Sequence, residues 1–146
     1  MTLPEPVPGL VIRYAYLWYS EYEEGREEGT KDRPCAIVAA IRLNENGETR
    51  VLVLPITHSP PERAQLAVEI PQRVKERLGL DADRSWAVLS EWNEFTWPGP
   101  DLRPVPGADD RAVAYGFLPP RLFAVIREKF LSLIEARAAE RVQCTE

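Results

Sequence analysis

The fold is decided by residues 33–57, which read Arg33-Pro-Cys-Ala-Ile-Val-Ala-Ala-Ile-Arg-Leu-Asn-Glu-Asn-Gly-Glu-Thr-Arg-Val-Leu-Val-Leu-Pro-Ile-Thr57. Two apolar runs, residues 33–42 and 49–57, lie on either side of Asn46-Gly47, a dipeptide that adopts positive φ at little cost. The first run is almost continuously apolar, which is typical of a strand covered on both faces. The stretch therefore predicts a β-hairpin.

The segments around this hairpin predict further strands and two helices. Residues 9–18 are rich in β-branched and aromatic side chains, as strands are. The other predicted elements are strands at 85–92 and 112–118, a weakly alternating candidate strand at 65–70, a short helix at 71–78, a long loop at 93–112 and a helix from Pro119-Pro120 to about Arg141. Pro55 lacks a backbone N–H, so it predicts an edge or a bulge at the end of the second hairpin strand.

The C-terminal helix has one apolar face, which predicts core packing or dimer packing. The face follows a spacing of three and then four residues and consists of Leu122, Val125, Ile126, Phe130, Leu133, Ile134 and Arg137. Together these elements predict a mainly β fold with helices, a small partly open barrel plus a C-terminal α-helix. Residues 1–8 are expected to be an extended arm, residues 9–141 a single domain and residues 142–146 a tail.

The composition excludes several classes of function. The 146 residues are 45% hydrophobic and 28% charged, as in ordinary globular proteins. The formal net charge of -5 does not attract nucleic acid or anionic membrane, so a nucleic-acid role requires a local basic pocket. The sequence has neither a membrane-spanning apolar run nor a secretory signal, and the positions of Cys35 and Cys144 do not indicate a disulfide. We expect a cytoplasmic protein with no membrane partner.

The motifs that are missing narrow the chemistry further. His58 is the only histidine and there is no Cys/His cluster, so no metal site is predicted. The sequence has no glycine-rich nucleotide loop, and we expect no cofactor. A Ser–His–acid triad would need His58 and Ser59, but sequence neighbours rarely bring their side chains together at a strand end. A small-molecule hydrolase therefore ranks last among the possible functions.

Arg33 and Thr57 are the two polar residues that the hairpin brings to one end. In an antiparallel hairpin, the start of the first strand lies beside the end of the second. A guanidinium binds two oxygens of a phosphate or carboxylate, and a hydroxyl adds a third contact. The alternative is a structural role, in which Arg33 pairs with Asp32 or a loop glutamate and Thr57 caps a turn.

The order of these pieces resembles the MazF/PemK family of toxins from toxin–antitoxin systems. The pieces are Gly9-Leu-Val-Ile, a polar loop through Gly25 and Gly29, Arg33-Pro-Cys-Ala-Ile-Val38, Val53-Leu-Pro-Ile-Thr57, Trp86-Ala-Val-Leu-Ser-Glu-Trp92, Gly116-Phe-Leu and the terminal helix. The likeness covers most of residues 9–137. Each motif is short, so the resemblance rests on their combination.

The resemblance implies an SH3-like barrel that forms a homodimer, with an antitoxin protein as partner. It also implies a metal-independent endoribonuclease that cleaves single-stranded RNA by attack of the ribose 2′-hydroxyl. Arg33 and Thr57 match the catalytic arginine and threonine of the family. Arg33 would supply positive charge where the phosphorane gathers negative charge, and Thr57 would hydrogen-bond the phosphate.

Two further sets of residues are candidates for this site. His58 and Ser59 could act as acid or base or contact the substrate, although in a straight strand His58 points to the face opposite Thr57. The residues expected to contact RNA or a partner are Lys31, Trp92, Asn93, Phe95 and Trp97. The segment that carries the rings is acidic and proline-rich, so the rings could stack on bases or pack against the barrel. A non-catalytic interaction domain that binds a protein partner is the alternative function.

Overall fold

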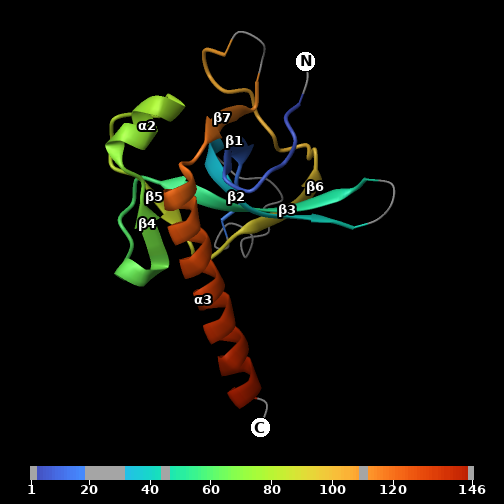
Figure 1. Ribbon diagram of the computed structural model, residues 1–146, viewed down its shortest axis with the longest axis vertical. Coiled ribbons are helices and arrows are strands. Elements are labelled where there is room, and N and C mark those ends of the chain that lie inside the picture. Colours follow the sequence, from blue (N-terminus) through green and yellow to red (C-terminus); the bar gives the residue numbers. More distant parts are fainter. Residues whose placement is uncertain (1–2, 19–31, 44–46, 109–111, 145–146) are drawn as a thin grey trace.

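The strands form one antiparallel sheet that curls into a half-barrel, and the C-terminal helix packs against it (Figure 1). The computed structural model describes residues 3–18, 32–43, 47–108 and 112–144, with side chains as far as Arg137. The elements are β1 (Leu10–Ala15), β2 (Asp32–Arg42), β3 (Thr49–Thr57), the 3-10 turn η1 (Ala64–Leu66), β4 (Ala67–Glu69), α2 (Gln72–Leu78), β5 (Trp86–Val88), β6 (Asn93–Trp97), β7 (Ala114–Phe117) and α3 (Pro120–Cys144). The predicted fold class is confirmed.

The predicted hairpin of β2 and β3 is confirmed. Its antiparallel register pairs Cys35 with Pro55 near the open end. Val38 is an extra residue in β2 and makes a β-bulge, which increases the local twist of the hairpin. Residues 44–46 of the predicted turn lie outside the described part, and Gly47 after them has a φ of +85°, which glycine adopts easily.

β3 has strand neighbours on both of its sides. β2 runs along one side, while on the other side β6 pairs with Thr49–Val53 and β5 pairs with Ile56–Thr57. Pro55 falls in the gap between these two partners, where β3 supplies no N–H to a second ladder. β3 is thus an interior strand and not the predicted edge. Pro55 lies at the position of β3 where the absence of a main-chain N–H removes no hydrogen bond to β5 or β6.

The long loop predicted at 93–112 is wrong at its start, because residues 93–97 form β6. Phe95 packs against the core of the barrel, while Glu94 and Thr96 on either side of it are exposed. This alternation, together with aromatic and β-branched residues, is the usual signal of a half-buried strand. The many prolines that follow favoured the prediction of a loop for the whole segment, although residues 93–97 alternate as a strand does.

The other predicted elements are present, and the strands are shorter than predicted. The strands predicted at 9–18, 65–70, 85–92 and 112–118 are observed as β1, β4, β5 and β7. α2 begins after Pro71 and ends at Gly79, whose φ of +74° closes the helix. α3 begins at Pro120 and runs to Cys144. Over the described ranges, no helix has the length and apolar character needed to cross a membrane.

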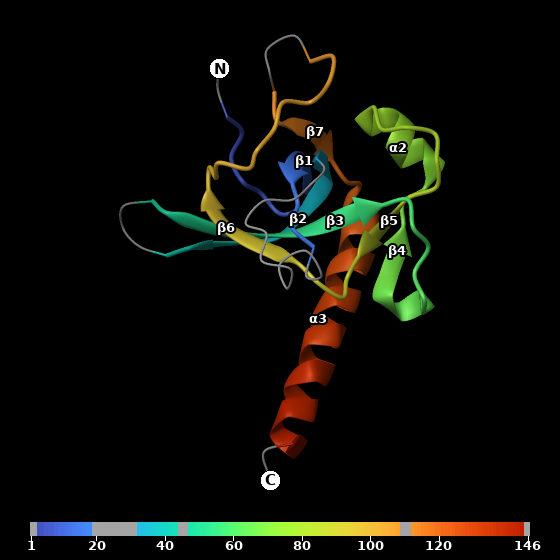
Figure 2. The same cartoon turned by 180° about the vertical axis from the view of Figure 1, so that it is seen from behind.

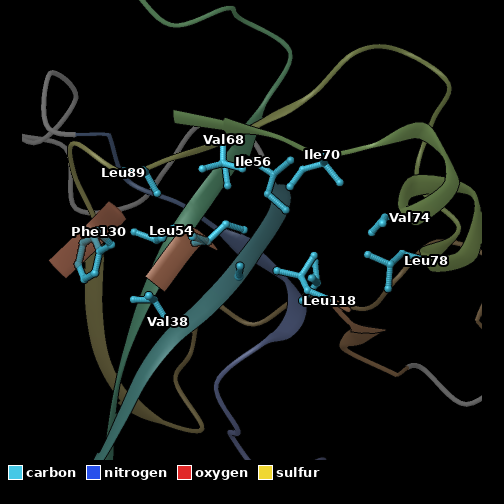
Figure 3. Packing of buried hydrophobic residues seen from close by; sticks show 14 residues of the cluster. Val38, Leu54, Ile56, Val68, Ile70, Val74, Leu78, Leu89, Leu118 and Phe130 are labelled. Atoms are coloured by element: carbon cyan, nitrogen blue, oxygen red, sulfur yellow. The ribbon is translucent and has the colours of Figure 1, made fainter. Parts of the chain in front are cut away.

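The sheet buries apolar side chains on both of its faces. On one face, α2 and α3 cover a cluster that includes Leu54, Ile126 and Phe130 (Figure 3). On the inner face of the curled sheet, a second cluster surrounds Val53. The apolar stripe of α3 therefore serves core packing in part, although Val125 is exposed. The last turns of α3 extend beyond the strands in both views (Figures 1 and 2).

Leu54 tests whether this shared core stabilises the fold. Its side chain is fully buried at the centre of β3, so Leu54→Ala should lower the free energy of unfolding by about 2–5 kcal/mol. Leu43→Ala removes the same atoms from an exposed position and should change it by less than about 0.5 kcal/mol. Urea unfolding of the two variants measures the difference, and equal losses would contradict this account of the core.

Candidate functional site

A pocket of about 390 Å³ lies where β2 begins and β3 ends. Its walls also include the end of α2 and parts of β1 and β7. The lining side chains that carry charge or form hydrogen bonds are Arg13, Asp32, Arg33, Thr57, His58, Lys75, Asp81, Ser85 and Tyr115. The volume is within the range of small-ligand sites. Three residues predicted from the sequence, Arg33, Thr57 and His58, therefore meet at one pocket.

The position of Arg33 follows from the strand register. Continued two residues beyond the pair of Cys35 and Pro55, this register sets Arg33 opposite Thr57. The guanidinium lies over the Trp18 ring, with Cζ 4.9 Å from the ring centroid. Its Nε atom is buried and has no hydrogen-bond partner among the described residues. Because a buried donor without an acceptor is costly, this N–H is suited to an oxygen atom of a ligand.

Asp32 does not serve as the counter-ion of Arg33, which was one of the alternatives. Its carboxylate lies 3.9 Å from Arg13 Nε and 3.6 Å from Arg103 Nε. Arg13 also donates a hydrogen bond of 3.2 Å to the Tyr115 hydroxyl. Two other arginines thus share this carboxylate, and within the described residues Arg33 forms no ion pair. The loop glutamates proposed as partners lie outside the described part.

Thr57 is the last residue of β3 and lies between two pockets. Its Oγ1 accepts a hydrogen bond of 3.2 Å from the Ser59 main-chain N–H, so it does cap a turn. The hydroxyl proton is not used in that bond and can be donated to a ligand. The second pocket has a volume of about 400 Å³ and is lined by Thr57, Ser59 and Trp18 with mostly apolar neighbours. An extended ligand could therefore occupy both pockets with its middle at Thr57.

His58 is held by an ionic network at the other side of the first pocket. β3 ends at Thr57 and the chain bends at His58, so the expectation for a straight strand does not decide its direction. The imidazole Nε2 lies 2.8 Å from Asp81 Oδ2, and Asp81 Oδ1 lies 2.6 Å from Lys75 Nζ. Hydrogen bonding to the Lys75 ammonium lowers the pKa of Asp81, and His58 acts in the same direction. Asp81 is therefore an ionised carboxylate that contacts both the His58 imidazole and the Lys75 ammonium.

The same network contains the described residues that come closest to a metal-binding cluster. His58, Asp81 and Asp83 place one ligand atom each within 4.8 Å of one another. Lys75 already compensates the charge of Asp81, and its ammonium also donates to the Asp83 carbonyl. Because a cation of the chain occupies this position, we assign no metal ion to the cluster.

Of the residues predicted to contact RNA or a partner, the four that the structure describes, Trp92, Asn93, Phe95 and Trp97, do not line the first pocket. Phe95 stacks on Tyr14, with ring centroids 4.7 Å apart, and Trp97 lies against the same cluster. Trp92 packs edge-to-face on a ring of α3, 5.4 Å away. Of the two readings of these aromatic rings, packing against the barrel is the one observed.

Three further positions from the sequence analysis remain: the predicted contact residues Asn93 and Lys31, and the thiol of Cys35. The Asn93 side chain bonds both main-chain groups of Leu17, at 2.8 Å each, and so fixes the end of the segment after β1. Lys31 lies outside the described residues. Cys35 is a free thiol that is fully buried, and burial raises its pKa, so it stays protonated and is no nucleophile.

Several residues of the site were not singled out from the sequence. Arg13 carried a signal, because a charged side chain inside the apolar strand β1 needs a partner or a pocket. The sequence gives no such signal for Trp18, Lys75 and Asp81. Each of them reaches the site from a turn or helix whose position depends on the whole fold. Lys75 in particular lies on a short helix with exposed charged neighbours, yet it is only 1% exposed.

A comparison with known protein families finds a match. A family model described as PemK-like, MazF-like toxin of type II toxin-antitoxin system matches residues 15–94. The matched range includes β2, β3 and the Arg33, Thr57 and His58 side chains. No curated protein matches the chain significantly.

The Asp81 carboxylate predicts a specific acid dependence of stability. Its folded-state pKa lies below the ordinary value of 3.8, so the unfolded chain binds more protons in this range. The stabilisation is present above pH 3.8 and is lost as the pH falls below it. Asp81→Asn should therefore lower stability at neutral pH and flatten its acid dependence, as measured by urea unfolding at a series of pH values.

Asp83→Asn is the matched control for this change. Asp83 contacts Lys75 through its main-chain carbonyl, which the substitution keeps. This variant should retain the acid dependence of the wild type. If Asp81→Asn and the wild type lose stability equally on acidification, the ionic network does not stabilise the fold in the way described.

Proposed function

The chain belongs to the PemK-like, MazF-like toxins of type II toxin–antitoxin systems, and from this membership we propose that it is an endoribonuclease that cleaves single-stranded RNA at Arg33 and Thr57. The observation that carries the proposal is the buried Nε of Arg33, which has no partner among the described residues. It supports a site built for an anionic oxygen, and the phosphodiester of RNA supplies one.

The chemistry needs neither a metal ion nor a protein nucleophile. In the proposed reaction the ribose 2′-oxygen attacks the adjacent phosphorus, and negative charge accumulates on the phosphorane oxygens. Arg33 stabilises that charge because its guanidinium is fixed on the Trp18 ring. Thr57 donates its hydroxyl proton to a second phosphate oxygen. Both groups are oriented before the substrate arrives, which favours the transition state.

The two pockets on either side of Thr57 suit a polymeric substrate that extends through both. Single-stranded RNA exposes its bases and backbone, so a phosphate at Thr57 leaves one nucleotide for each pocket. The mostly apolar lining of the second pocket suits a base, whereas the first pocket carries most of the charged side chains. A duplex would bring its bases stacked and paired, and they could not enter two separate pockets.

Family membership implies a cognate antitoxin, and we propose further properties on the same basis. The active form is a homodimer, and the site acts in the cytoplasm, where RNA and the antitoxin are found. The net charge of -5 means that RNA affinity depends on the local cations at the pocket.

Arg33→Ala tests the proposed activity. The substitution removes the positive charge from the phosphate position, so cleavage of a single-stranded RNA by the purified protein should fall about 10²- to 10³-fold. Arg127→Ala removes an exposed arginine of α3 and is the matched control, with cleavage expected to be unchanged. The measurement is the rate of appearance of products with a 2′,3′-cyclic phosphate in a buffer with chelator.

Two outcomes would contradict this function. Wild-type and Arg33→Ala proteins that are equally harmless to cells, and leave cellular RNA intact, would exclude the toxin activity. Stable binding to a protein partner without RNA cleavage at any practical concentration would instead favour the non-catalytic interaction domain.

The homodimer is tested by light scattering during size-exclusion chromatography. The expected mass is twice the 16.6 kDa of one chain. Exposed Val125 and Leu131 on α3 provide apolar surface for such an interface. A mass equal to one chain across the accessible concentration range would count against the dimer.

A further inference from the structure

His58 is the only histidine in the chain, and the structure fixes one of its two ring nitrogens. Its Nε2 lies 2.8 Å from Asp81 Oδ2, which is hydrogen-bonding distance. The ring lines the same pocket as Arg33 and Thr57. About half of the imidazole is exposed, so a substrate in the pocket can reach the ring.

Asp81 is itself held in place by a buried lysine. Lys75 is 1% exposed and donates to Asp81 Oδ1 at 2.6 Å, to Ser85 Oγ at 2.7 Å and to the Asp83 carbonyl. The ammonium thus uses all three of its protons on fixed acceptors. Asp81 Oδ1 also accepts the Asp83 main-chain N–H at 3.2 Å. The carboxylate that faces His58 is therefore anchored on its far side.

This anchoring decides where the proton of a neutral His58 lies. The pKa of Asp81 is lowered by Lys75 first and by His58 second, so its carboxylate is ionised and can only accept hydrogen bonds. Nε2 must then carry the hydrogen that it donates, and Nδ1 is left with a lone pair. A histidine held in one tautomer by a carboxylate is prepared to take a proton through its other nitrogen.

We propose that His58 is the proton-transfer group of this site and that Asp81 is its positioning residue, an inference that rests on the proposed endoribonuclease function. His58 Nδ1 takes the proton of the ribose 2′-hydroxyl while the O2′–P bond forms. The P–O5′ bond breaks, and the departing 5′-oxygen takes a proton from water. His58 afterwards returns its proton to the solvent, so atoms and charge balance.

The surroundings of His58 are consistent with this role. The charged and titratable side chains that share its pocket are Arg13, Asp32, Arg33, Lys75, Asp81 and Tyr115. Asp32 is shared by two arginines and Asp81 is anchored by Lys75, so each carboxylate has its own cation. Among the described residues, Asp81 is the carboxylate within ion-pair distance of the imidazole, and the Asp83 carboxylate lies farther away, within 4.8 Å of the ring.

Nuclear magnetic resonance tests the positioning role without RNA. A single histidine gives a single imidazole in protein labelled with ¹⁵N-histidine and carrying no histidine tag. At a pH where the ring is neutral, wild type should be protonated at Nε2. Asp81→Asn places an amide there that can donate as well as accept, so the Nδ1-protonated form should gain population. Identical tautomer populations in the two proteins would overturn the assignment of Asp81.

Single-turnover cleavage tests the proton transfer. His58→Ala should lower the rate about 10²- to 10⁴-fold and remove the rise of the rate with pH, and added imidazole should restore part of the rate. Asp81→Asn should lower kcat with KM unchanged. Asp83→Asn, in the same cluster, should leave both unchanged. Because His58→Ala does not touch Lys75, it stays informative if Asp81→Asn folds poorly.

The possible outcomes separate this inference from the proposed function. Cleavage that depends on Arg33 but is unchanged in rate and pH profile by His58→Ala would overturn the role of His58 and leave the endoribonuclease intact. A loss of rate that imidazole does not restore would mean that the ring only supports the structure. No cleavage by the wild type would overturn the proposed function, and the proton-transfer role with it.

Discussion

The structure depends on a change of partners along one side of β3. β6 pairs with the first half of that side and β5 with its end, while β2 pairs with the other side from Thr49 to Pro55. Between the part of β3 that pairs with β6 and the part that pairs with β5, a main-chain N–H would be left without a strand partner. Pro55 lies in this gap and has no N–H to donate, so the change of partner leaves no donor unsatisfied there. After the proline, Ile56 and Thr57 pair with β5, so the strand keeps its direction up to Thr57. The end of β3 is thereby fixed beside the start of β2, which gives the pocket its position.

Arg33 occupies this position at an energetic cost. Its Nε is desolvated without an acceptor among the described residues, and an unsatisfied buried donor costs about 1–3 kcal/mol. The contact with Trp18 offsets part of that cost through cation–π attraction. A structural arginine would find a carboxylate, and the adjacent Asp32 is occupied by two other arginines. The arrangement is what a binding site requires, since a donor already satisfied by the protein would gain little from a phosphate.

The part of this architecture that the sequence predicts is the part governed by local rules. Register follows from counting through an Asn-Gly turn, so the hairpin and the approach of Arg33 to Thr57 could be predicted. β6 was missed because its short alternating pattern runs directly into prolines. The His58–Asp81–Lys75 network could not be predicted at all: its members come from a strand end, a helix and the segment after that helix. They come together only because α2 packs on the sheet, and neither the hydrophobic periodicity nor any motif of the sequence predicts that packing.

The network also shows how an acidic chain can present a local positive site. A net charge of -5 would oppose a polyanion if the carboxylates near the pocket were free. Each of the two that line it is instead bound to cations of the protein, Asp32 to two arginines and Asp81 to buried Lys75. These pairs offset the charge of both carboxylates, whereas Arg33 has no ion pair within the described residues. Because opposite charges in contact screen one another at short range, Arg33 and not the net charge of the chain would govern the attraction of an anion to the proposed phosphate position.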